Sequence, residues 1–356
     1  MDFTFNADQQ AFRDSMRRFL MVEAAPEKLR DVWQTDAGRS PEMRANLAEQ
    51  GLTALSVPEA HGGLGLGDVD WVLMTQELGY FGIPDSLADT AYVAAGLLAA
   101  LPQGHQVRET WLPRIADGSG RIAVGHSVNP WVADAHLADL LLLPHQTLQG
   151  TEVHAVDPAT VQLTACPSID ASRRLAQVAW APTEATRIAD AAPGQGLWND
   201  TLERGAVSVS GQLIGRAQRM LDLSIDYVAQ RKQFGKPIGS FQAVKHHLAD
   251  VVTKIEFAKP VLYRAAYALA HGETRSALRV SHAKLVCADA AWTAARKGIQ
   301  VHGAMGYTWE VDLQMFMKRA WVLDAAWGDR AFHKARLADA LLADGTPLGP
   351  GATFNN

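Results

Sequence analysis

The chain has 356 residues, 48% hydrophobic and 20% charged, which is enough to bury a large core. A net charge of −5 argues against a nucleic acid partner, because such partners select an excess of Lys and Arg. Cys166 and Cys287 stand outside any C-x-x-C pattern, which excludes a cysteine-rich metal site and favours the cytoplasm. No apolar run approaches the ~20 residues that cross a bilayer, so we expect neither a signal segment nor a membrane span, and we predict no metal site.

The first third of the chain predicts helices. Asn6, with a glutamine three residues later, has the pattern of a capping box before an apolar periodic run. Ser40 before a proline predicts a second helix start. Asp68 follows a glycine-rich turn at 58–66 and is placed to cap a third helix, and a fourth is expected over 87–101.

The texture of the sequence changes twice after that. Short β-like runs separated by Pro, Asn and Asp occupy about 120–190, and amphipathic helical patterns then return as an antiparallel bundle requires. The predicted fold class is mainly α with a small β domain. The predicted domains are an α-helical N-terminal domain (1–118), a small β middle domain (119–195), a C-terminal four-helix bundle (196–345) and a tail (346–356).

The string RKQFGKPIGSFQAVKHHLADV begins at Arg231 and is the most unusual in the chain. A helix ends at 231–232, a break follows at 234–237, and Ser240 can cap the next helix. A guanidinium beside free backbone N–H groups and a helix N-terminus suits a pyrophosphate, because charge and dipole both favour an anion. A basic, solvated loop between helices explains the same string, and the string alone does not decide between them.

A second string, GIQVHGAMGYTWEVD over 298–312, interrupts the helical pattern with three glycines. Glycine there permits either a close approach of a ligand to the backbone or simple helix termination. His302 has no partner at metal-binding spacing, so we interpret it as a structural or surface histidine and assign it no catalytic role.

Four ordered strings resemble the acyl-CoA dehydrogenase family of flavoproteins. They are PEAHGGLGL at 58–66, the string from Arg231, QVHGAMGYTWE at 300–310 and KRAWVLDAAWGD at 318–329, so the resemblance covers nearly the whole chain. It implies an α-helical N-terminal domain, a β-barrel-like middle domain and a C-terminal four-helix bundle. The implied reaction is α,β-desaturation of an acyl-CoA thioester, with FAD at a subunit interface and electrons passed to an electron-transfer flavoprotein.

The resemblance also implies which residues contact FAD. Matching positions place a cofactor-binding set at the pyrophosphate or adenosine end of the FAD of a neighbouring subunit, so an oligomer is expected. The last three members of the set contribute backbone. The set is Arg231, Gln233, Phe234, Gln300, Val301, His302 and Gly303.

This chain departs from the family pattern at the catalytic base. Most members have a Tyr-Glu-Gly-Thr motif, whereas this chain reads AWGD and places Trp327 at the glutamate position. Some members carry the base on the first bundle helix, where this chain offers Asp200 and Glu203 nearby. Glu203 is therefore a candidate base, but we favour its interpretation as one half of an exposed charge pair with Arg204 at a helix start.

A second departure lies in the middle domain. Family members carry a segment rich in Thr, Ser and Gly that hydrogen-bonds the flavin ring, whereas this chain has HSVNPWVADAHLADLLLL. Ser127, Asn129 and Trp131 are possible substitutes for the missing donors. The alternative, which we favour, is that the β domain serves only as a scaffold.

These features together resemble the short β-type subunits of bacterial α2β2 acyl-CoA dehydrogenases, known in the degradation of steroid side chains and related lipids. Such a subunit completes the FAD site of a catalytic partner. One alternative is a self-sufficient homo-oligomer with Glu203 or Asp324 as base. The others are a flavin-free interaction subunit, and a flavin oxidase or monooxygenase with the same fold.

Overall fold

The computed structural model describes residues 4–346 and 349, so all of the predicted tail except residues 346 and 349 lies outside the described residues. The chain forms two compact units. We call the first the bundle unit; it comprises residues up to 24, residues 72–82 and the chain from 206 onward. We call the second the β unit; it comprises residues 25–71 and 83–205.

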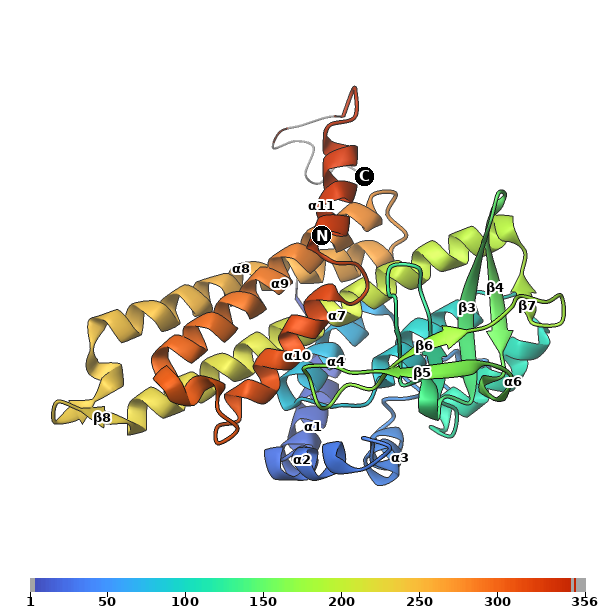
Figure 1. Ribbon diagram of the computed structural model, residues 1–356. Helices are drawn as coiled ribbons and strands as arrows, with labels where there is room; N and C mark the ends of the chain where they lie inside the picture. Colours follow the sequence, from blue (N-terminus) through green and yellow to red (C-terminus); the bar gives the residue numbers. More distant parts are fainter. Residues whose placement is uncertain (1–3, 347–348, 350–356) are drawn as a thin grey trace. The chain divides into compact units, whose positions relative to one another are not determined.

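Long helices build the bundle unit. Figure 1 shows three of them, α8, α9 and α10, packed side by side. Alanine is the most frequent residue on the buried face of α9, which lets its neighbours approach closely. The helices are α1 (Ala7–Glu23), α4 (Asp68–Phe81) from Val72, α7 (Ala191–Gln230) from Ala206, α8 (Gln242–Ala270), α9 (Ser276–His302), α10 (Leu313–Ala325) and α11 (Arg330–Leu341).

Helices α4 and α7 meet backbone to backbone. A Cβ atom on Gly215 of α7 would lie 2.0 Å from the carbonyl oxygen of Gln76, and one on Gly211 would lie 2.0 Å from the hydroxyl of Thr75. Real Cβ atoms do not approach other atoms this closely. Glycine at these two positions therefore sets the spacing of the two helices.

Two small sheets build the core of the β unit. The first has the order β1-β3-β4-β7, with β1 parallel to β3 and the other pairs antiparallel, and the second has the antiparallel order β2-β6-β5. Side chains from both sheets, such as Leu141 and Ala176, share one apolar cluster. The strands are β1 (Ile122–Val124), β2 (Val132–Ala133), β3 (Leu140–Thr147), β4 (Gly150–Val156), β5 (Gln162–Cys166), β6 (Leu175–Ala179) and β7 (Arg187–Ala189).

Short helices complete the β unit. They are α2 (Pro26–Gln34), α3 (Pro41–Glu49), the 3-10 turn η1 (Glu59–His61), the π-helix η2 (Asp89–Ala94), α5 (Ala95–Ala99), α6 (Gln106–Ala116), and the 3-10 turns η3 (Ala135–Leu137) and η4 (Pro158–Thr160). The helix predicted over 87–101 is therefore present, but with a π-helical turn inside it.

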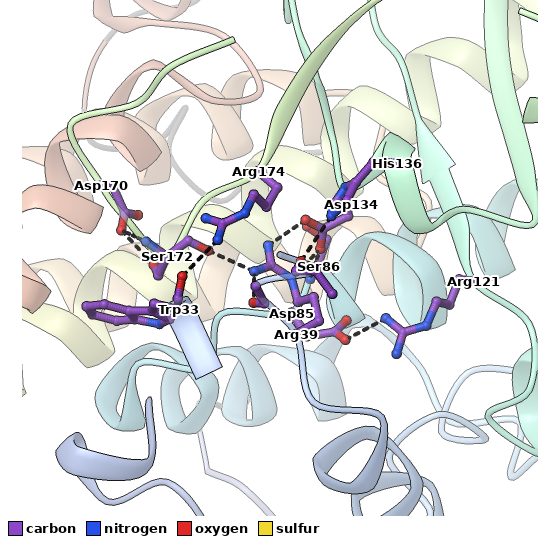
Figure 2. A network of polar contacts seen from close by, with 12 residues as sticks. Trp33, Arg39, Asp85, Ser86, Arg121, Asp134, His136, Asp170, Ser172 and Arg174 are labelled. Carbon is purple, nitrogen blue, oxygen red and sulfur yellow. Dashed lines mark hydrogen bonds and ion pairs between the residues drawn. The ribbon is translucent and has the colours of Figure 1, made fainter. Parts of the chain in front are cut away.

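A buried ion pair ties the helical part of the β unit to its strands (Figure 2). The Nε atom of Arg39 donates to Asp134 over 2.9 Å, and a second guanidinium nitrogen donates to the other carboxylate oxygen. Arg39 also donates to the carbonyl of Ser172, and the backbone N–H of Ser86 donates to Asp134. Burial alone would raise the pKa of Asp134, but Arg39 and the Ser86 amide outweigh burial and lower it.

The local helix starts follow the sequence patterns in two of four cases. Asn6 forms the predicted capping box, and the hydroxyl of Ser40 accepts from the Met43 amide. The cap predicted at Asp68 is wrong, because Asp68 is the first residue of α4 and its carboxylate accepts from Tyr92. The cap predicted at Ser240 is also wrong, because its hydroxyl donates to the Pro237 carbonyl within a 3-10 turn.

We expect Gly215→Ala to destabilise the protein by about 1–3 kcal/mol, because the new methyl group collides with a backbone carbonyl that cannot rotate away. The matched control is Gly196→Ala in the same helix, where a Cβ meets nothing within 4 Å, and this change should be neutral or stabilising by about 0.5–1 kcal/mol. Urea unfolding measures both, and equal effects would contradict the close-contact explanation.

Replacing Arg39 with Met should cost about 3–5 kcal/mol, because it leaves the Asp134 carboxylate buried without its cation. Lys254→Met is the control, since it removes an exposed pair with Asp289 and should cost less than about 1 kcal/mol. The two unfolding free energies are compared near neutral pH. A small loss for Arg39→Met would show that the buried pair does not hold the unit together.

Candidate functional site

The first predicted segment forms an exposed hairpin at the end of α7 (Figure 1). Strands β8 (Lys232–Gln233) and β9 (Lys236–Pro237) pair across a two-residue turn. Both turn residues have positive φ, +53° at Phe234 and +77° at Gly235, as in a type I′ turn. Phenylalanine is strained in this conformation, and yet its side chain is 91% exposed. Its ring meets the Phe241 ring edge to face, with centroids 6.1 Å apart. A strained aromatic ring that stays this exposed indicates a contact surface.

Charge and hydrogen-bonding groups surround that ring. Arg231, Lys232, Gln233 and Lys236 are all exposed in the same hairpin. Cations and amide donors beside an accessible aromatic ring form a surface that suits a phosphate-bearing heterocycle. The 3-10 turn η5 (Ile238–Ser240) then leads into α8.

The second predicted segment lies at the C-terminal end of α9. Gln300 is exposed, whereas the side chains of Val301 and His302 are buried, so these two offer only backbone to a ligand. Gly303 ends the helix with φ +65° and starts the 3-10 turn η6 (Gly303–Tyr307). His302 packs inside the bundle unit, which agrees with its interpretation as a structural histidine.

Contacts inside the bundle unit bring the ends of α7 and α9 together. The Tyr227 ring lies on the His302 ring with centroids 4.2 Å apart. One turn earlier, a Cβ on Gly298 would lie 3.3 Å from the hydroxyl of Ser224. The two segments therefore occupy the same end of the helical bundle.

The family resemblance places the usual catalytic base at position 327, where this chain has no carboxylate. Trp327 stands there, 3% exposed and with φ +56°. The ammonium group of buried Lys284 donates to the carbonyls of Asp324 and Gly328, at 2.7 and 2.9 Å. The Nε2 atom of His333 donates to the Trp327 carbonyl over 3.0 Å. The loop is thus fixed by hydrogen bonds to its backbone.

Burial perturbs both groups that hold this loop. Desolvation lowers the pKa of Lys284 to about 8, although Asp324 partly offsets it, and desolvation lowers the pKa of His333 to about 4. Asp324, the alternative base, binds Arg330 through one carboxylate oxygen at 2.8 Å. These groups are engaged in holding the loop.

Glu203 is not an exposed residue at a helix start, so that interpretation is wrong. Helix α7 begins at Ala191, upstream of the predicted start, so Glu203 lies well inside the helix. The residue is only 4% exposed. Its neighbour Arg204 pairs with Asp68 at 3.4 Å. The same Asp68 carboxylate accepts a hydrogen bond from the Tyr92 hydroxyl, and burial together with this carboxylate raises the pKa of Tyr92 well above its ordinary value. Asp200 is exposed.

The middle-domain segment folds into a tight turn. The backbone N–H of Asn129 donates to the backbone carbonyl of His126 over 2.7 Å. The buried His126 ring stacks on Trp198 with centroids 5.2 Å apart. Ser127 and Trp131 are exposed, and Asn129 is half-buried. His126 thus packs on the indole ring of Trp198, in the same unit.

A cavity of about 450 Å³ in the bundle unit was not predicted from the sequence. Its most buried acid is Glu77, whose pKa burial raises despite Arg17 at 3.2 Å. The cations at the rim each have an acidic partner, so the cavity shows no unpaired charge for a ligand. Its lining residues are Arg13, Asp14, Arg17, Leu73, Gln76, Glu77, Tyr80, Ile214, Gly215, Gln218, Lys259 and Tyr263.

Residues 4–346 contain neither a membrane-spanning helix nor a metal-binding cluster. Within 4–346, no helix has the length and hydropathy that a bilayer span needs. The same stretch contains no cluster of three or more His, Cys, Asp or Glu side chains arranged to hold a metal ion.

We expect the stability difference between the wild type and Lys284→Met to depend on pH. Between about pH 8 and 10.4 the unfolded chain keeps the Lys284 proton while the folded chain releases it, so stability rises with pH. The wild type should gain about 3 kcal/mol relative to the variant across that range. Denaturant unfolding at several pH values measures this gain, and parallel curves would contradict a neutralised buried lysine.

Comparisons with known proteins place this architecture in one family. The model of the acyl-CoA dehydrogenase N-terminal domain matches residues 6–119, and that of the C-terminal domain matches 194–342. The acyl-CoA dehydrogenase IpdE2 of Mycobacterium tuberculosis is 32% identical over 318 residues, covering 88% of this chain and 91% of IpdE2.

Solved structures have the same fold. A chain of the ChsE4-ChsE5 complex from Mycobacterium tuberculosis matches with a TM-score of 0.87 and 22% identity, covering 98% of this chain and 100% of that one. Butyryl-CoA dehydrogenase from Megasphaera elsdenii matches with a TM-score of 0.85 and 21% identity, covering 96% and 100%. The predicted fold class, oxidoreductase class and FAD cofactor are confirmed at the level of the family. This chain belongs to the acyl-CoA dehydrogenase family.

Proposed function

We propose that this chain is a subunit of an FAD-dependent acyl-CoA dehydrogenase and that it completes the FAD site of a catalytic partner in an α2β2 complex. The observation that carries the proposal is a combination within the bundle unit. The base position holds buried Trp327, whereas most of the residues matched to the adenosine end of FAD lie exposed. The exposed members are Arg231, Gln233, Phe234, Gln300 and Gly303. The residues matched to the adenosine end of FAD are kept, whereas Trp327 replaces the catalytic base.

The exposed hairpin fits the pyrophosphate and adenosine end of FAD. Arg231 supplies a cation that forms charge-assisted hydrogen bonds to phosphate oxygens, and Phe234 supplies a ring on which a purine stacks. Gln233 and Gln300 supply amide donors, and the turn at Gly303 leaves room for the backbone to approach the ligand. FAD, when bound, accepts the hydride in the desaturation of the acyl-CoA thioester.

The missing base argues for a partner that supplies it. Removal of the α-proton requires a carboxylate beside the substrate, and the loop of this chain places an indole ring there and fixes it through Lys284 and His333. The partner therefore provides the base and most of the flavin-ring contacts.

The relatives support a partner subunit. One structural neighbour is a complex of two different chains, ChsE4 and ChsE5, and the sequence relative IpdE2 is an acyl-CoA dehydrogenase. We further propose that an electron-transfer flavoprotein accepts the electrons of the complex. Its proposed substrates are CoA thioesters of steroid side chains or related lipids. Both cysteines are free, in keeping with a reducing cytoplasm.

A second candidate function rests on the burial of Glu203. A buried carboxylate on the β-unit part of α7 has the environment of a general base, and this favours a self-sufficient homo-oligomer. Glu203→Gln separates the two functions. Unchanged turnover of the partnered complex agrees with the main proposal, and loss of turnover in the pure homomer favours the second.

We expect the purified chain alone to be colourless and the complex with its partner to be yellow, with one FAD per αβ pair. Arg231→Ala in the complex should weaken FAD binding about 10–100-fold, the range of a lost charge-assisted hydrogen bond. Lys334→Ala is the control, because it removes an exposed charge on α11, outside both segments, and it should change binding less than about 3-fold.

Absorbance and fluorescence titration of FAD measure these quantities. A yellow lone chain that bleaches on anaerobic addition of acyl-CoA would contradict the proposal. Equal losses for the two variants would reduce the role of Arg231 to general surface charge.

A further inference from the structure

We call the hairpin from Arg231 and the end of α9 at residues 300–303 the FAD half-site. Tyr227 contacts both of these segments and belongs to neither. It lies in the last turn of α7, where its backbone carbonyl accepts from the Arg231 amide over 2.9 Å. Its ring stacks on His302 of α9 with centroids 4.2 Å apart and planes 23° apart. Its hydroxyl reaches the His302 carbonyl at 3.4 Å. Tyr227 thus links the residue that starts the hairpin to the residue that ends α9.

His302 is held in one orientation for this contact. Its Nδ1 atom lies 2.8 Å from the Gly298 carbonyl, and because a carbonyl can only accept, Nδ1 carries the hydrogen. Burial lowers the pKa of His302 and so keeps the ring neutral at neutral pH. Gly303, with its positive φ, follows directly. A fixed ring at position 302 therefore fixes the direction in which the chain leaves α9.

Few contacts hold the exposed hairpin, residues 231–236. Two backbone hydrogen bonds join it to its base, from the Arg231 amide to the Tyr227 carbonyl and from the Ile238 amide to the Arg231 carbonyl. Beyond these, the side chains of Phe234 and Lys236 contact the Phe241 ring. An exposed segment that must be ordered on binding costs affinity. An anchor that orders the hairpin in advance lowers that cost.

We propose that Tyr227 is a positioning residue for FAD, which sets the spacing between Arg231 and Gln300 by stacking on His302. It makes no contact with the cofactor itself. This inference rests on the proposed function, because it assumes that both segments hold one FAD molecule.

A stack of this kind can also serve packing alone, and the two roles differ in what a mutation changes. A packing role lowers the stability of the FAD-free complex and leaves the FAD affinity of the folded fraction unchanged. A positioning role lowers FAD affinity beyond any change in that stability. The conservative change Tyr227→Phe keeps the ring and should preserve affinity.

The experiment uses the complex of this chain with its partner after FAD has been removed. FAD is titrated back by fluorescence, and the melting temperature of the FAD-free complex is measured in parallel. Tyr227→Leu should weaken FAD binding about 10-fold or more, and Tyr227→Phe less than about 3-fold, with FAD-free melting temperatures close to that of the wild type. Tyr227→Leu with wild-type affinity would overturn the proposal.

Two further variants make the test sharper. His302→Asn keeps a donor for Gly298 and loses the ring, so it should weaken binding as Tyr227→Leu does, and it replaces that variant if Tyr227→Leu does not assemble. The double variant should lose no more than either single one, because one stack is removed in all three. Additive losses would overturn the proposal.

Arg231→Ala separates this inference from the proposed function. If Arg231→Ala leaves FAD binding unchanged, the half-site itself is absent and both proposals fail. If Arg231→Ala weakens binding and Tyr227→Leu does not, the half-site stands and only the positioning role fails.

Discussion

The direct backbone contact between α4 and α7 is the constraint on which the bundle unit depends. Two glycines on α7, at positions 211 and 215, remove the side chains that would hold the helices apart. The same helix continues to Tyr227 and ends beside Arg231. Any change in how α7 sits on α4 therefore reaches the hairpin directly, since a helix transmits displacement along its axis with little loss.

The loop at Trp327 is held by hydrogen bonds to its backbone. Trp327 is buried, and His333 binds its backbone carbonyl. Lys284 contributes an ammonium group to two further carbonyls, at the cost of carrying a charge into the core. Buried polar groups of this kind define one loop conformation rather than add stability.

The sequence predicts features that depend on neighbours along the chain and misses those that depend on neighbours in space. The Asn6 capping box needs only residues within one turn, and it is present. Asp68 has the same local pattern, but Tyr92 and Arg204 approach its carboxylate from elsewhere in the β unit. The pattern at Ser240 fails for a different reason, because a 3-10 turn displaces the helix start to Gln242.

Site residues follow the same rule. The predicted exposure of Glu203 is wrong because α7 begins at Ala191, upstream of Glu203, where Asp190 and Pro193 form a start signal. Lys284 lies at helical spacing between the buried residues Val280 and Cys287, a pattern that indicates its burial. The partnership of Tyr227 with His302 has no local signal, because it joins residues 75 positions apart.

The strained, exposed Phe234 affects how the separate chain behaves in solution. Phe234, Tyr307 and Trp309 all present large rings to water on the separate chain. Exposed aromatic surface of this kind marks an interaction site and favours self-association of the separate chain. Under the proposed function a partner covers these rings, so the separate chain is expected to be more prone to self-association than the complex.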